Sequence, residues 1–227
     1  TVFEGVHGLF QAFAHTADGD YDALVGEFGA RWVIDALAFK PYPCGTMAQP
    51  YIDCARRLGM RGIAPEDVSE IICEVAEGTV HRLWEPLADK QRPPNGYAAK
   101  FAVPYLLAFG FVHGGVGLGA FTDDAIADER VLALAAKVKF EIDPENPYPS
   151  RFTGHIKATL NDGSVVEERQ PHLRGGAQEP LTRKDVVDKF RLNAAHGGWS
   201  AAQSEAALKL IERLYQQGRI DLGALRV

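Results

Sequence analysis

Cysteine is scarce in this chain of 227 residues, which has only three: Cys44, Cys54 and Cys73. They are odd in number and lie far apart in the sequence. Such spacing forms neither a disulfide framework nor a CxxC metal pair. We therefore expect a reducing, cytoplasmic setting.

Basic runs and long apolar runs are also missing. The formal net charge is −6, and no cluster of Lys and Arg is able to neutralise several phosphates, so we exclude nucleic acid as the main partner. The longest strongly apolar stretch, Val103 to Val112, is too short for a bilayer, which needs about 20 residues, and we expect no membrane partner. No two histidines have HxxxH spacing, so we expect no metal.

The chain opens on Thr1 without a signal-peptide pattern. An amphipathic pattern starts almost at once, with Leu9, Phe10 and Phe13 at helical spacing. This opening predicts an excised, processed or split part of a longer polypeptide.

Helical and strand patterns alternate along the chain. Helices are predicted over residues 6–16, 21–28, 47–58, 99–114, 125–137, 184–195 and 201–217. Strands are predicted over residues 31–39, 68–80, 138–142, 152–160 and 164–170, with a loop over 84–96. Two local signals are strong: Asn161-Asp162-Gly163 predicts a β-hairpin, and Thr182 with Asp185 predicts a capping box.

This order of elements predicts an α+β fold. A small mixed α+β domain, residues 31–180, is flanked by helices at residues 1–30 and 181–227. The flanking helices carry apolar faces that would be exposed alone, so we expect a helical partner to cover them.

Six segments occur in an order that resembles the MmgE/PrpD family. They are FEGVHGLFQAF, KPYPC with its following helix, AKFAVPYLLA, FTDDAIADERVLALAAKV, the hairpin around NDG, and PLTRKDVVDKFR. The resemblance implies that the α+β domain is a lid on a large helical domain. It also implies that this chain is roughly the C-terminal half of a family member, and that a catalytic Asp, two His and a Lys lie in the other half.

The same resemblance implies a cofactor-free lyase that acts on a small hydroxy-di- or tricarboxylate, as a homodimer. Negative charge builds on a carboxylate-stabilised carbanion in such reactions, and fixed cations lower that barrier. We expect dehydration rather than decarboxylation. Two alternatives stay open: an epimerase or isomerase of a similar diacid, and a non-catalytic lid subunit that needs a helical partner chain.

Lys40 is the predicted ligand for the substrate carboxylates. It matches the family lysine that faces these groups, and Pro41 and Pro43 stiffen its backbone. The alternative is a solvated lysine at the end of a strand. Cys44 on the same turn is either an accessory donor or a buried, inert thiol.

Gly45 and Gln49 stand where the family's decarboxylases or many other relatives carry histidine. Gly45 offers only a backbone N–H, and Gln49 forms hydrogen bonds but is no base near neutral pH. We count both among the substrate-binding positions.

His81 is the predicted catalytic residue. It lies near the position of a tyrosine in the family's lid, and it is expected to end the strand over residues 68–80, where site residues often project. The alternative is an exposed histidine at a strand end, with no role in catalysis.

Overall fold

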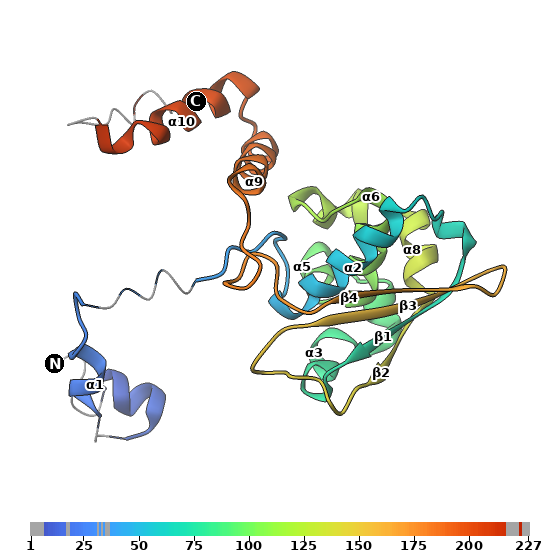
Figure 1. Cartoon of the computed structure of the whole chain (residues 1–227), viewed down its shortest axis with the longest axis horizontal. Coiled ribbons are helices and arrows are strands. Elements are labelled where there is room, and N and C mark those ends of the chain that lie inside the picture. Colours follow the sequence, from blue (N-terminus) through green and yellow to red (C-terminus); the bar gives the residue numbers. More distant parts are fainter. Residues whose placement is uncertain are drawn as a thin grey trace. The chain divides into compact units, whose positions relative to one another are not determined.

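A computed structural model describes residues 7–16, 19–30, 32, 34, 37–216 and 223 of the chain. The chain divides into two compact units, Thr1–Leu37 and Ala38–Val227. In the first unit, a π-helical turn spans Phe10–Ala14 and α1 spans Tyr21–Val25 (Figure 1). The α1 helix is capped by Asp20, whose carboxylate accepts a hydrogen bond of 2.9 Å from the Ala23 N–H.

The second unit is built on a four-stranded mixed sheet in the order β2-β1-β3-β4. The strands are β1 (Val68–Val75), β2 (Val138–Ile142), β3 (Gly154–Leu160) and β4 (Val165–Gln170). β1 pairs parallel with β2 and antiparallel with β3, and β3 pairs antiparallel with β4. The predicted hairpin between β3 and β4 is confirmed, with Gly163 in the left-handed region its turn requires.

The α2 helix (Gln49–Met60) lies on one face of this sheet (Figure 1). The helices that follow between β1 and β2 in the sequence are α3 (Val80–Leu83), α4 (Leu87–Gln91), α5 (Gly96–Ala99), α6 (Val103–His113), α7 (Asp123–Ile126) and α8 (Glu129–Ala135). The α2 helix packs on both β3 and β4 and against α6, which in turn packs against α8.

The α6 helix is the centre of the core, because nearly all of its side chains are buried. A helix that is apolar all round has to be enclosed. It approaches α2 closely at two glycines: a β-carbon on Gly59 would lie 2.4 Å from the Phe111 carbonyl oxygen, and one on Gly110 would lie 2.9 Å from the Ile52 side chain. Larger residues at either position would push the two helices apart.

Charged side chains on β1, β2, β3 and β4 form the charged face of the sheet. Lys139 Nζ lies 2.9 Å from a Glu70 carboxylate oxygen, and Lys157 Nζ lies 2.7 Å from one of Glu74. The ring of His155 lies between Glu74 and a Glu167 oxygen, the latter at 3.3 Å. Ion pairs therefore connect neighbouring strands on this face. The charged face consists of Glu70, Glu74, Lys139, His155, Lys157 and Glu167.

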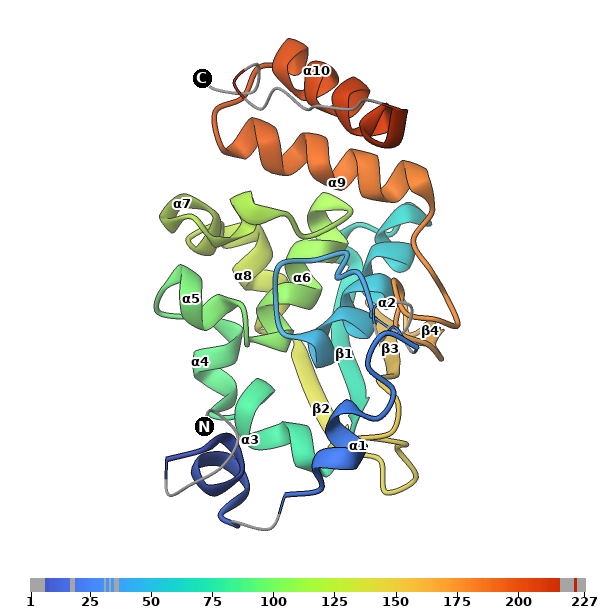
Figure 2. The same cartoon turned by 90° about the vertical axis from the view of Figure 1, so that its left-hand side faces the viewer.

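Two helices follow the sheet. The α9 helix (Arg183–His196) begins with the predicted capping box of Thr182 and Asp185, which is confirmed. The α10 helix (Ala201–Glu212) lies beside α9 (Figure 2). Their assignment to a larger helical domain, like the division at residues 30 and 180, stays a prediction.

The α+β fold class is confirmed, but four predicted elements are wrong. The strand over residues 68–80 stops at Val75, and a 3-10 turn and α3 follow it. The loop over 84–96 contains α4, because Pro86 lies just before the first turn of that helix. The helix over 125–137 is instead α7 and α8, since Asp128 caps a new helix. Of the strand over 31–39, residues 32, 34 and 37–39 are described, and none of them lies in a strand.

The helix prediction at the N-terminus is confirmed only over a short turn, and Val6 lies outside the described residues. Within the described part of the chain, no helix is long and apolar enough to cross a membrane.

Candidate functional site

Lys40 lies on a turn that folds back on itself. Its ammonium donates a hydrogen bond of 3.3 Å to the Cys44 carbonyl oxygen, four residues further along. The Gly45 N–H donates to the Lys100 carbonyl oxygen at 2.9 Å, so this N–H already has a partner within the chain. The side chain of Lys40 therefore projects from a closed turn that is tied to the segment before α6.

Tyr42 anchors this turn in the core. Its hydroxyl donates to Asp53 Oδ1 at 2.6 Å, and Arg174 Nε donates to the same oxygen at 2.9 Å. Arg174 Nη2 also donates to the Tyr42 hydroxyl oxygen at 3.1 Å, and its guanidinium lies over the Tyr42 ring. Burial, together with the Asp53 charge, raises the pKa of Tyr42 well above its usual value, so the phenol stays neutral.

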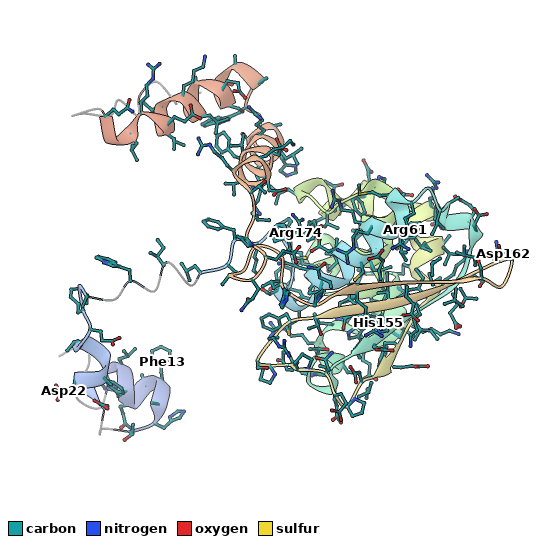
Figure 3. All side chains as sticks on the ribbon, viewed as in Figure 1. Phe13, Asp22, Arg61, His155, Asp162 and Arg174 are labelled. Carbon is teal, nitrogen blue, oxygen red and sulfur yellow. The ribbon has the colours of Figure 1, made fainter. Side chains whose placement is uncertain are left out.

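The hydrogen bonds among Tyr42, Asp53 and Arg174 hold the turn in place, since all three side chains are largely buried. Tyr42 is 4% exposed, Asp53 is 2% exposed, and the Arg174 side chain is 21% exposed. Figure 3 shows Arg174 at the end of the sheet from which the chain continues to α9, opposite the hairpin tip that carries Asp162. The Lys40 turn is thus fixed to α2 and to the loop after β4.

Gln49 supports the same turn from the first residue of α2. It is fully buried, and its Nε2 donates to the Tyr42 carbonyl oxygen at 3.4 Å. Gln49 Oε1 and Asp53 Oδ2 lie one helical turn apart in sequence, and neither has a hydrogen-bond partner among the described residues.

Two cavities border the Lys40 turn, and α9 forms one wall of each. The smaller, about 380 Å³, is lined by Lys40, Lys189, Asn193 and apolar side chains from residues 38–39 and from 181–190. The larger, about 410 Å³, lies between Tyr42, Arg174, the Gly-rich segment after α6 and α9. Lys189 borders both cavities.

Lys189 is joined directly to the turn. Its ammonium donates to the Lys40 backbone carbonyl oxygen at 2.7 Å. Burial, and beyond it the positive charge of Lys40, lowers the pKa of Lys189, although the nearby Cys44 acts in the opposite direction. We call Lys40 and Lys189 the lysine pair.

No carboxylate neutralises the lysine pair in the part of the chain that the structure describes. The two nearby acids on α9 are engaged elsewhere. Asp185 accepts hydrogen bonds from Thr182 at the start of the helix, and Asp188 pairs with Lys184 and Arg191. The lysine pair is therefore positive and open to an anion from outside.

Cys44 is a buried thiol, 6% exposed. Burial raises its pKa to about 12, more than the neighbouring lysine charges lower it, so the thiol stays protonated at neutral pH. Cys54 and Cys73 are also buried, and all three are free thiols. Nucleophilic chemistry at Cys44 is not supported by this environment.

His81 is not brought to the lysine pair. It lies on the exposed side of α3, not at the end of a strand, and it lines neither cavity that borders the turn. The same helix does approach the turn through Leu83, whose Cδ2 lies 3.7 Å from the point that a β-carbon on Gly45 would occupy. Three of the five predicted site residues thus lie on one turn, Gln49 contacts that turn from α2, and His81 lies apart.

Sequence reasoning missed Asp53, Arg174 and Lys189. A weak signal existed for Lys189: it interrupts an apolar stripe of α9, between Val186 and Phe190, where a cation is unexpected. Arg174 precedes two glycines in a loop, and nothing local links it to Tyr42, 132 positions away. The described residues contain no group of three His, Cys, Asp or Glu that suits a metal ion.

Residues 42–215 match the MmgE/PrpD C-terminal domain. Cis-aconitate decarboxylase of Mus musculus is 26% identical over 175 residues, which cover 72% of this chain and 34% of the relative. The human cis-aconitate decarboxylase is 25% identical over 193 residues, covering 81% and 38%.

A third relative has a different printed activity. The mitochondrial 2-methylcitrate dehydratase of Yarrowia lipolytica is 27% identical over 187 residues, which cover 74% of this chain and 35% of the relative. The matched part spans roughly a third of the length of each of the three relatives.

Proposed function

The chain belongs to the MmgE/PrpD family, and on that premise we propose that it is the lid-bearing part of a cofactor-free lyase. Its substrate is a small hydroxy-di- or tricarboxylate, and the reaction is the elimination of water. Relatives named as a decarboxylase and as a dehydratase support a lyase that acts on a carboxylate.

The observation that carries the proposal is a lysine held on a fixed turn without a neutralising acid among the described residues. In the elimination, a base removes the proton next to a carboxylate, the electron pair forms the new C=C bond, and hydroxide leaves with a proton as water. Negative charge spreads onto the carboxylate in the transition state. A fixed ammonium stabilises that charge more than it stabilises the ground state.

Dehydration is favoured over decarboxylation because Gly45 stands where the family's decarboxylases carry histidine and Gln49 stands where many other relatives carry one. Gly45 has no side chain, and Gln49 is buried under Tyr42. The proton is moved by His81 or by a residue of the helical part that the family implies. We keep His81 as a candidate to be tested by substitution, since apo geometry alone does not exclude a catalytic base.

A helical partner is part of the proposal. In the first unit, Phe13 is 79% exposed and Phe28 is 93% exposed. Large apolar side chains of this kind are covered in a stable assembly. The mass of the purified assembly tests whether a helical partner is bound. The same measurement tests the expected homodimer.

The deciding experiment replaces Lys40 in the complete enzyme. With 2-methylcitrate as substrate and the absorbance of the conjugated alkene product as readout, Lys40→Ala should lower kcat/KM by about tenfold or more. Lys40→Arg keeps the cation and should retain more activity, while Lys139→Ala, a lysine of the charged face, should not differ from the wild type. Unchanged kinetics for Lys40→Ala would remove this turn from the active site.

A second assay distinguishes the alternatives. Release of CO₂ from cis-aconitate would indicate decarboxylation. Deuterium from D₂O that appears in recovered substrate without an alkene product would indicate an epimerase or isomerase. His81→Gln belongs in the same series: a fall in kcat with KM preserved would support proton transfer by His81.

A further inference from the structure

We propose that Lys189 is a substrate-binding residue that, together with Lys40, makes the enzyme select substrates with at least two carboxylates. This inference rests on the proposed function and extends it to a residue on α9. Lys40 would hold one carboxylate and Lys189 a second, across the cavity of about 380 Å³ that both residues line.

The first argument is that hydrogen bonds hold both lysine side chains on the same turn. The Lys189 ammonium is held at the Lys40 carbonyl oxygen, and the turn that carries Lys40 is itself locked by the Tyr42, Asp53 and Arg174 network. The Lys189 ammonium is therefore held against the same turn on which the Lys40 ammonium is bonded to Cys44. A fixed pair of cations matches two carboxylates on one small molecule better than it matches two independent ions, because less ordering is needed on binding.

The second argument is electrostatic. The two like charges repel each other, Lys189 being partly buried and Lys40 exposed, and each also acts on Cys44. No acid relieves this repulsion among the residues that the structure describes. An anion with two carboxylates removes the repulsion and gains two charge-assisted hydrogen-bond partners.

The third argument is the lining of the cavity. Among the residues that line this cavity, the lysine pair and Asn193 are polar. Asn193 lies one helical turn after Lys189 on α9. Phe39, Leu181 and Phe190 form much of the rest. An apolar cavity with a few convergent polar groups is typical of a site for a small molecule.

The test uses the complete enzyme and two inhibitors without a leaving group: tricarballylate, which has three carboxylates, and butyrate, which has one. Lys189→Gln keeps an N–H donor for the Lys40 carbonyl but loses the charge. It should raise the inhibition constant of tricarballylate roughly tenfold and leave that of butyrate within about twofold. Lys189→Arg should restore tricarballylate binding, and Lys184→Gln on the same helix should change neither value.

Two results would overturn the inference. Equal inhibition constants for Lys189→Gln and the wild type exclude a role in binding. If the inhibition constants of both inhibitors rise equally, Lys189 stabilises the turn and does not bind a second carboxylate.

Lys40→Ala, measured in parallel, separates this inference from the proposed function. If Lys40→Ala weakens inhibition and catalysis while Lys189→Gln does neither, only the inference fails. If Lys40→Ala is also without effect, the proposed site fails as well.

A second measurement needs no variant. Acetylation of wild-type lysines by acetic anhydride, read by mass spectrometry, should slow at Lys40 and Lys189 together when tricarballylate is added, but not at Lys184. Protection of Lys40 with undiminished acetylation of Lys189 would contradict the proposal.

Discussion

Lysines lie both on the charged face of the sheet and in the lysine pair, but the two regions differ in whether a lysine has an acidic partner. On the charged face, Lys139 and Lys157 each lie within 3 Å of a glutamate oxygen. In the lysine pair, each ammonium is bonded to a backbone carbonyl, and no acid of the described chain neutralises it. Paired charges on a strand surface are typical of a structural face, whereas charges without a counter-ion indicate a place for an anion.

The largest effect is expected from removing the guanidinium that locks the turn. Arg174→Met leaves Asp53 buried with only the Tyr42 hydroxyl on its Oδ1, and we expect the free energy of unfolding to fall by about 3 kcal/mol. Urea unfolding measures this. Arg130→Met, which breaks an exposed pair with Glu66, is the matched control and should cost much less than Arg174→Met. Equal losses in the two variants would show that burial of the network is energetically unimportant.

The next effect is stabilisation by an anion. Tricarballylate at about 100 times its dissociation constant should stabilise the complete protein by about 2.7 kcal/mol, seen as a rise in Tm. The rise should shrink in Lys40→Ala and in Lys189→Gln, and it should persist in Lys157→Ala on the charged face. A rise that depends on Lys157 would reverse the comparison between the two regions.

A smaller effect is the acid sensitivity of the charged face. Burial works against it, but hydrogen bonds from Lys157 and His155 together lower the pKa of Glu74 below its usual value of 4.5. Since the folded-state pKa is depressed, the stabilisation is present above pH 4.5 and is lost as the pH falls through the folded-state value. Glu74→Gln should flatten the acid limb of stability against pH, by about 1 kcal/mol at most.

That acid limb is measured by chemical unfolding at successive pH values, with Glu141→Gln on β2 as the control. An acid limb of the same steepness in wild type and Glu74→Gln would show that these hydrogen bonds carry no net stability.

The smallest effect is expected at an exposed pair of the charged face. The Lys139 side chain is 60% exposed, so Lys139→Ala should change the free energy of unfolding by about 0.5 kcal/mol or less. Its kcat/KM should equal that of the wild type. A loss of activity in this variant would indicate that the substrate binds at the charged face and not at the lysine pair.

Local signals in the sequence predicted the elements that local physics decides. The Asn161-Asp162-Gly163 turn and the Thr182 capping box depend on a few neighbouring residues, and both are confirmed. The strand predicted up to Val80 is wrong after Val75, because alternating side chains do not reveal where the partner strands end.

The predicted site shows the same limit. The Lys40 turn was found because its residues are adjacent in the sequence and resemble a family motif. Arg174 and Lys189 reach it only through the folding of distant segments, at separations of 132 and 149 positions. Contacts between residues so far apart produce no periodic pattern in a single sequence. The role of Lys189 as the second cation could therefore be inferred only from the structure.

The close packing of α2 against α6 has a consequence for how variants of this protein are read. Gly59 and Gly110 lie where α2 and α6 contact each other, and they set the spacing of the helix that carries Gln49 and Asp53. A methyl group added at either glycine would move that helix and carry the Tyr42 anchor with it. Under the proposed function, such a substitution would weaken substrate binding although Lys40 and Lys189 are unchanged.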